Sequence, residues 1–159
     1  ITLKGPLRAA GRTAWVHPGL TNEFSAPFAS LKGCRLGKRS WMEKFGDWHH
    51  SDVIEEWSNG AEASWPFTAL EAGSYHIYAD YECRAEADYS EFEIEVAGMR
   101  WMFPAIYTGG GEGLRTRTRH VRLGLIDIPA GTGEIAIRGR DIKDRKAFML
   151  QKMTLEPAD

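Results

Sequence analysis

The segment that decides the fold reads YHIYADYE at residues 75–82. Its apolar positions alternate with polar or amphipathic ones: Tyr75, Ile77, Ala79 and Tyr81 against His76, Tyr78, Asp80 and Glu82. Successive side chains of a β-strand point to opposite faces, so this period of two predicts a strand with one buried and one solvated face. Similar alternation recurs at 91–96, 120–125 and 134–138, and residues 148–157 mark a last strand. The pattern predicts an all-β, antiparallel β-sandwich.

The connections between these strands are of two kinds. Three short connections share an Ala-Gly step, at residues 72–73, 97–98 and 130–131, where Gly tolerates the positive φ of a tight turn. Four others are long and irregular, at residues 37–51, 84–89, 105–114 and 139–146. If residues 52–67 and 116–129 each form one kinked strand, all short turns lie at one end of the sandwich. We therefore expect the binding site at the opposite, loop-rich end.

Composition narrows the function classes. The 159 residues suit one domain, and the net charge of -2 gives no bulk attraction to nucleic acid or anionic lipid. No apolar run is long enough to span a membrane. Six Trp residues are a surplus in so short a chain, and such a surplus often marks a binding surface.

The beginning of the chain differs from the rest. Residues 1–27 carry Gly-Pro and Pro-Gly steps with little alternation, which predicts a strap along the domain or the remnant of a linker. Residues 28–159 then form the sandwich. The start at Ile1, without Met, predicts a processed chain or a domain cut from a longer protein. Cys34 and Cys83 fall in different candidate strands, and either a disulfide or two free thiols fits the sequence.

A set of short motifs runs in order from residue 31 to residue 157: Leu31-Lys32-Gly33, Trp57, Trp65 and the segments 73–77, 81–83, 92–98, 121–124, 128–131 and 149–157. In these motifs the chain resembles the jelly-roll modules appended to bacterial α-L-fucosidases and sulfatases, which are akin to family 6 and family 35 carbohydrate-binding modules. These motifs belong to the scaffold rather than to a ligand site.

The resemblance implies a jelly roll attached to a polysaccharide-active enzyme, in a secreted, periplasmic or cell-surface protein. It also implies that no cofactor is required, although a structural calcium ion is often present. In the related modules the last long loop supplies a polar contact to the sugar. Here that role would fall to Asp141 or Arg145, while a plain charged turn is the alternative reading.

Aromatic residues in the long connections are the candidates for stacking on a sugar ring. Trp41 and Trp48 lie in the longest connection, and Trp101 and Tyr107 flank or enter the one at 105–114. Alternatively, Trp41 and Trp48 are lids on the core, and at least one of Trp101 and Phe103 is a core residue. Trp57 and Trp65 fall within strand patterns and are expected to be structural.

A stripe of arginines suggests an anionic ligand. Arg115, Arg117 and Arg119 occupy alternate positions and point the same way, and guanidinium groups match sulfate or carboxylate. An acidic or sulfated glycan is one reading. The other is a solvated face paired with Glu91, Glu93 and Glu95 on a neighbouring strand.

One cluster has metal-ligand residue types: Asp47, His49, His50 and Asp52. Adjacent His residues rarely both ligate one zinc ion, so a hydrogen bond from His49 to a sugar, or a solvated loop, competes with the metal reading.

The sequence contains no nucleophile elbow, phosphate loop or zinc-protease motif. The leading hypothesis is therefore a non-catalytic, lectin-like module that binds a polysaccharide or oligosaccharide and targets an attached enzyme to it. A structural accessory domain without a ligand, and an adhesion module, are the alternatives.

Overall fold

The computed structural model describes residues 13–109 and 117–158, and these residues form strands and two short 3₁₀ turns. The first half contains β1 (Ala14–Val16), β2 (Asn22–Ser25), η1 (Ala26–Phe28), β3 (Ser30–Lys32), β4 (Arg35–Lys44), β5 (Asp47–Glu55), β6 (Glu62–Ala69) and β7 (Gly73–Cys83). The second half contains η2 (Ala85–Ala87), β8 (Glu91–Val96), β9 (Met99–Pro104), β10 (Arg119–Ile128), β11 (Gly131–Asp141) and β12 (Phe148–Pro157). No helix in these ranges is long and apolar enough to cross a membrane.

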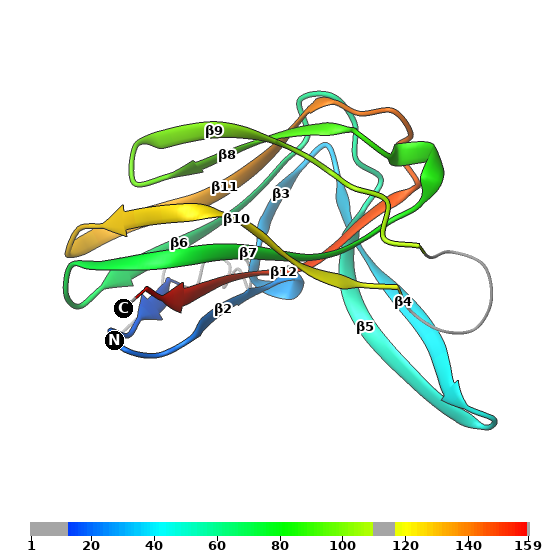
Figure 1. The fold of residues 1–159 in the computed structure, drawn as a ribbon, viewed down its shortest axis with the longest axis horizontal. Coiled ribbons are helices and arrows are strands. Elements are labelled where there is room, and N and C mark those ends of the chain that lie inside the picture. Colours follow the sequence, from blue (N-terminus) through cyan, green and yellow to red (C-terminus); the bar gives the residue numbers. More distant parts are fainter. Residues whose placement is uncertain (1–12, 110–116, 159) are drawn as a thin grey trace, which may run out of the picture.

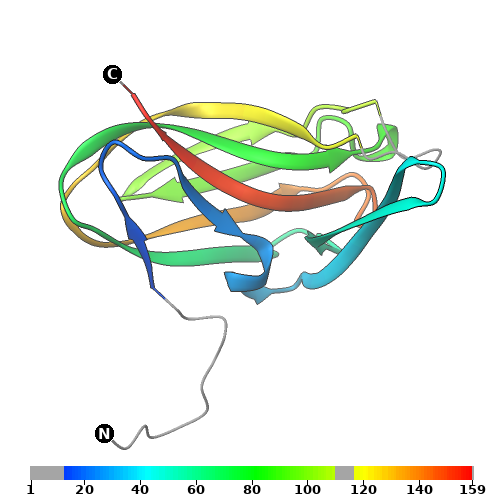
Figure 2. The same ribbon diagram turned by 90° about the horizontal axis from the view of Figure 1, so that it is seen from below.

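The strands make two sheets that pack face to face (Figures 1 and 2). Sheet A has the order β1-β6-β11-β8-β9, with β3 also paired to β6. Sheet B has the order β10-β7-β12-β5-β4, with β2 also paired to β12. Every pair is antiparallel except β1 with β6. The predicted antiparallel β-sandwich is confirmed.

Aromatic side chains fill the space between the sheets. Trp57 is fully buried and packs edge-on against Phe92 and Phe148, at ring-centroid distances of 5.4 and 5.9 Å. Its indole N–H donates to the carbonyl of Ile54, and that of Trp65 donates to another backbone carbonyl, so neither burial leaves a polar atom unpaired. The structural role predicted for Trp57 and Trp65 is confirmed.

The three Ala-Gly connections lie together at one end of the sandwich, the left end in Figure 1. Those at 72–73 and 130–131 carry the chain from one sheet to the other, while the one at 97–98 closes the β8–β9 hairpin within sheet A. The reading of 52–67 as one kinked strand is wrong. β5 ends at Glu55 in sheet B, and β6 begins at Glu62 in sheet A.

The segment predicted as a strap is described from residue 13 onward. It contributes β1 to sheet A and β2 to sheet B, and it buries Val16 and Phe24 in the core. This part of the chain therefore closes one side of the sandwich. The domain boundary at residue 28 stays a prediction.

Candidate functional site

The longest predicted loop is a β-hairpin. β4 and β5 pair from Arg35↔Glu55 to Lys44↔Asp47, and Phe45-Gly46 makes the turn, with Gly46 at φ 82°. The hairpin projects beyond the sandwich (Figure 1). The predicted irregular connection at residues 37–51 is therefore wrong. Both faces of the projecting strands contact solvent, so they carry no apolar alternation that sequence could reveal.

The two hairpin indoles lie on opposite faces. Trp41 pairs across the hairpin with His49, and their rings stack at 5.7 Å with an interplanar angle of 17°. Trp48 pairs with Met42 at the adjacent position and is 54% exposed. Because adjacent positions of a strand face opposite sides, Trp41 and Trp48 cannot stack on the same sugar ring. Trp41 is half-buried, so neither indole is a fully buried lid.

A buried ion pair ties the Trp41 face of the hairpin to sheet B. Arg39, on the same face as Trp41, bonds the carboxylate of Glu82 on β7 through Nε at 3.1 Å and Nη2 at 3.4 Å. The side chains of Arg39 and Glu82 are only 15% and 2% exposed. The backbone N–H of Arg117 donates to the same carboxylate at 3.3 Å, so Glu82 anchors two segments of the chain.

Trp101 closes a side of the sandwich. Its indole N–H on β9 donates to the carbonyl of Leu123 on β10, and Gly124 leaves room for the ring, since a Cβ there would lie 3.4 Å from Trp101 Cζ2. β9 and β10 are the edges of the two sheets, so Trp101 bridges them. Phe103, two residues on, is a core residue, as one alternative expected.

The other predicted site residues stay apart from the hairpin aromatics. The ring of Tyr107 is 47% exposed, and its backbone N–H donates to Asp88. Asp141 forms an exposed ion pair with Lys143 at 2.8 Å. Arg145 bonds Glu56 at 3.0 Å beside an open cavity of about 500 Å³. The structure therefore divides the predicted site between the hairpin and the loop end.

The arginine stripe also takes an unexpected place. Arg115 lies outside the described residues, while Arg117 and Arg119 are exposed at the start of β10 in sheet B. The glutamates of β8 belong to sheet A, so the reading that paired them with this stripe is wrong.

The β8 glutamates have arginine partners of their own. Arg138 on β11 bonds both Glu93 and Glu95, at 3.1 and 3.0 Å. Hydrogen bonds from Arg140 and then Arg138 hold the pKa of Glu93 below its ordinary value. Arg100 and then Arg138 do the same for the pKa of Glu95. Glu93 and Glu95 are therefore paired with arginines of sheet A itself.

Metal and disulfide readings find no support in residues 13–109 and 117–158. Asp47 contacts His49 at 3.2 Å, and His50 contacts Ser40 at 2.7 Å. In those ranges no group of three or more His, Cys, Asp or Glu side chains is arranged to hold a metal. Cys34 and Cys83 are free thiols, and burial raises their pKa values to about 11 and about 12.

The sequence reasoning missed an aromatic pair on the outer face of sheet B, the face turned away from sheet A. Tyr78 on β7 stacks on His120 on β10, with ring centroids 4.1 Å apart and an interplanar angle of 8°. Nδ1 of His120 lies 2.5 Å from Asp80 Oδ1, and Nε2 lies 3.2 Å from Glu156 Oε1. Both residues sit at solvent-facing positions of the predicted alternation, but their adjacency depends on the β7–β10 pairing.

The same face holds two buried polar atoms that lack a hydrogen-bond partner among the described residues. They are Oγ1 of Thr154, which lies across from Tyr78, and Nδ1 of His76. Thr154 is only 2% exposed although its position faces outward. An unpaired buried polar atom costs about 1–3 kcal/mol, and burial shields both atoms from a ligand as well as from water.

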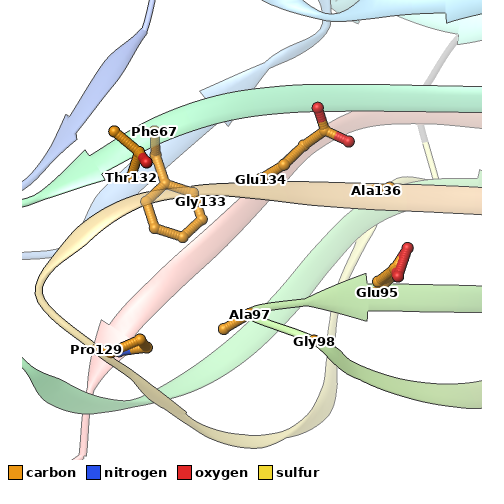
Figure 3. A pocket seen from close by; sticks show the side chains of 9 residues that line it. All are labelled: Phe67, Glu95, Ala97, Gly98, Pro129, Thr132, Gly133, Glu134 and Ala136. Atoms are coloured by element: carbon orange, nitrogen blue, oxygen red, sulfur yellow. The ribbon is translucent and has the colours of Figure 1, made fainter.

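A notch of about 490 Å³ lies near the Ala-Gly turns (Figure 3). The notch opens beside residues 131–134 of β11, because the pairing of β8 with β11 stops at Val96 and Ile135. Phe67 lies beneath Gly133. Glu134 and Glu95 flank it, but Phe67 is only 1% exposed. The notch therefore offers carboxylates without an exposed ring for stacking.

Solved structures share the fold. A family 35 carbohydrate-binding module from Clostridium thermocellum superposes with a TM-score of 0.68 at 15% identity, over 87% of this chain and 99% of that one. The family 6 module of Cellvibrio mixtus lichenase 5A, solved with cellotriose, gives 0.63 at 13% identity, over 87% and 98%. The jelly-roll resemblance is confirmed at the level of the fold.

The fold also occurs as one part of a longer chain. The Bacillus thuringiensis Cry1Da tryptic core gives a TM-score of 0.66 at 18% identity, over 95% of this chain and 26% of that one. No protein-family model matches the sequence, and no curated protein matches it either. At such low identities the similarity establishes architecture alone.

Proposed function

We propose that this chain, which has the architecture of family 6 and family 35 carbohydrate-binding modules, is itself a non-catalytic module that binds a glycan along the outer face of sheet B. One juxtaposition carries the proposal: the Tyr78–His120 ring pair lies among polar groups of three adjacent strands. A sugar presents C–H groups on its ring face and hydroxyls at its rim. It therefore needs an aromatic surface flanked by hydrogen-bonding groups.

The same face continues onto the hairpin. Tyr78, Asp80 and Glu82 point outward at alternate positions of β7, about 7 Å apart from one to the next. Glu82 bonds Arg39, and the Trp41–His49 ring pair follows on the same side of β4. Two ring pairs joined by polar groups suit an extended oligosaccharide better than a single sugar.

The similar structures support the proposed partners. The lichenase module was solved with cellotriose, and a Podospora anserina β-1,4-mannanase carries a family 35 module that superposes with a TM-score of 0.56. In our proposal the chain likewise holds a polysaccharide near an attached, secreted enzyme and raises the local substrate concentration. The structural calcium that the resemblance implies stays a prediction, and the described residues contain no group of three or more His, Cys, Asp or Glu side chains arranged to hold a metal. Comparison of melting temperatures with and without EDTA tests that ion.

The test is a calorimetric titration with cellotriose, β-1,4-manno-oligosaccharides, laminari-oligosaccharides and one uronic-acid oligosaccharide, followed by variants on the best ligand. We expect affinities between about millimolar and micromolar. Tyr78→Ala and Trp41→Ala should each weaken binding about tenfold, which corresponds to about 1.4 kcal/mol. Circular dichroism verifies that each variant is folded.

Two matched controls separate the outer face from other sites. Tyr107→Ala removes an exposed ring at the loop end, and Trp48→Ala removes one from the opposite hairpin face. Both variants should bind the glycan with a Kd within about twofold of the wild-type value, which corresponds to less than about 0.5 kcal/mol by the same conversion. Loss of binding in Tyr107→Ala, with Tyr78→Ala unaffected, would move the site to the loop end.

A second candidate function is packing on a partner domain without a ligand. A small cavity of about 250 Å³ opens between β1 and β2, and Phe28, which lines it with Trp65, is 48% exposed. Exposed apolar surface of this kind fits a protein contact. Absence of binding to every glycan of the panel would favour this candidate.

A further inference from the structure

His120 joins three adjacent strands of sheet B. It lies on β10, its Nδ1 contacts Asp80 on β7, and its Nε2 contacts Glu156 on β12. The imidazole also stacks on Tyr78 at 4.1 Å. The His120 side chain therefore connects strands β7, β10 and β12 to Tyr78, the ring proposed above to stack on the sugar.

Only the protonated ring satisfies this geometry. A neutral imidazole carries one N–H, whereas the imidazolium carries two. With a carboxylate at each ring nitrogen, the imidazolium donates to both Asp80 and Glu156. The neutral ring must turn one lone pair toward a carboxylate, which is repulsive and weakens the hold on the ring.

The surroundings favour the charged form. Partial burial lowers the pKa of His120, but the bond and attraction to Asp80, followed by those to Glu156, outweigh this and raise the pKa above its ordinary value. Other titratable or charged groups on this face include His76 and Glu82 on β7, Lys152 on β12, and Arg122 and Asp127 on β10 itself. Lys152 is bonded to Glu23 on β2 at 2.8 Å, so its charge is already balanced.

We propose that His120 is a pH-dependent positioning residue, whose doubly bonded imidazolium fixes the Tyr78 ring for stacking against the glycan. The inference rests on the function proposed above and adds its regulation. Binding of the glycan is strongest at acidic pH, where the imidazolium of His120 donates to both carboxylates. It weakens as the pH rises through the titration of His120. The charged form stabilises the fold in the same direction, since that contribution is lost on deprotonation.

The experiment measures two quantities over the same range, from about pH 5 to about pH 9, on either side of the ordinary imidazole pKa of about 6.5. Calorimetry gives the affinity for the best glycan of the panel, and NMR of the His120 ring gives its protonation. We expect the affinity to fall by about threefold or more, with a midpoint that matches the titration of His120.

Variants assign the midpoint to this residue. Asp80→Asn and Glu156→Gln each remove one carboxylate, so both midpoints should move together to lower pH. His120→Gln should bind with an affinity that does not vary with pH. His50→Gln, on the hairpin and bonded to Ser40, is the matched control and should keep the wild-type profile.

The outcomes separate the two proposals. Suppose that Tyr78→Ala loses affinity for the glycan while the affinity of the wild type stays constant across the pH range. That result would overturn the positioning role of His120 and leave the proposed binding site standing. A His120 titration that moves in Asp80→Asn while the affinity midpoint stays would do the same. Failure to bind any glycan at any pH would refute both proposals.

Discussion

Replacing Arg39 by methionine would remove the partner of a carboxylate that is almost fully shielded from water. Glu82 is 2% exposed, and it accepts two bonds from Arg39 and one from the backbone N–H of Arg117. Methionine keeps part of the apolar stem of arginine but donates no hydrogen bond. In Arg39→Met the buried carboxylate therefore keeps the N–H of Arg117 but loses the counter-charge that Arg39 supplies.

The magnitude follows from this burial. An exposed ion pair contributes about 0–1 kcal/mol, whereas removing one partner of a buried pair costs about 3–5 kcal/mol. The exposures of 15% and 2% place Arg39 and Glu82 in the second class. For a domain of this size each kcal/mol lowers the melting temperature by about 2–4 °C, so we expect a fall of about 6–20 °C.

Urea denaturation followed by circular dichroism and Trp fluorescence measures the loss. Arg39→Met/Glu82→Met removes both charges and should recover most of the stability. Arg100→Met, whose side chain is 63% exposed beside Glu95, is the control and should cost no more than about 1 kcal/mol. An Arg39→Met loss as small as that of the control would refute the reasoning. So would a double variant as unstable as Arg39→Met alone.

Further predictions concern the scaffold. Gly133→Ala would place a Cβ 2.5 Å from Cζ of Phe67, so its unfolding free energy should fall by about 1–3 kcal/mol, and an unchanged value in urea would contradict this. Hydrogen bonds from arginines lower the pKa values of Glu93 and Glu95 below 4.5, so the contribution of these two carboxylates to stability is present at neutral pH and lost in acid. Arg138→Met should accordingly have a lower unfolding free energy than the wild type at about pH 7, and the difference should shrink in acid. A difference that stays the same at every pH would argue against these ion pairs. Burial raises the pKa values of the Cys34 and Cys83 thiols to about 11 and about 12, so both should react slowly with Ellman's reagent at about pH 8. Both should react quickly once guanidinium unfolds the chain, and fast reaction of both thiols in the native protein would disprove this.

Strands that pack on the core were predictable from sequence. The alternation at 75–82 appears in β7, where each apolar position is buried and most of the others are only partly exposed. The signal exists because one face of such a strand contacts other side chains and the other face contacts water. The β4–β5 hairpin has no such signal beyond the sandwich edge, and the short strands β1 and β2 contain too few residues to establish a period.

The candidate site was predictable only in its parts. Tyr78 and His120 were both assigned to solvent-facing positions, but a bulge between Arg122 and Gly124 shifts the β7–β10 register, and sequence does not reveal where such a shift falls. The opposite orientation of Trp41 and Trp48 depends on a register shift as well. A two-residue turn at Phe45-Gly46 predicts the Lys44↔Asp47 pair, and without a bulge it would pair residue 43 with 48 and put both indoles on one face. The register shift between Met42 and Lys44 places them on opposite faces, and in this respect the simple hairpin prediction would have been wrong.

The gathering of the three Ala-Gly turns at one pole has a consequence for how such a protein can change. Insertions, deletions or wholesale exchange of a segment at the far pole leave the strand ladders and the three Ala-Gly turns untouched. Natural variation can therefore explore new specificities without rebuilding the framework. The tip of the β4–β5 hairpin, around residues 44–47, is accordingly a suitable position for a randomised library or a grafted recognition sequence.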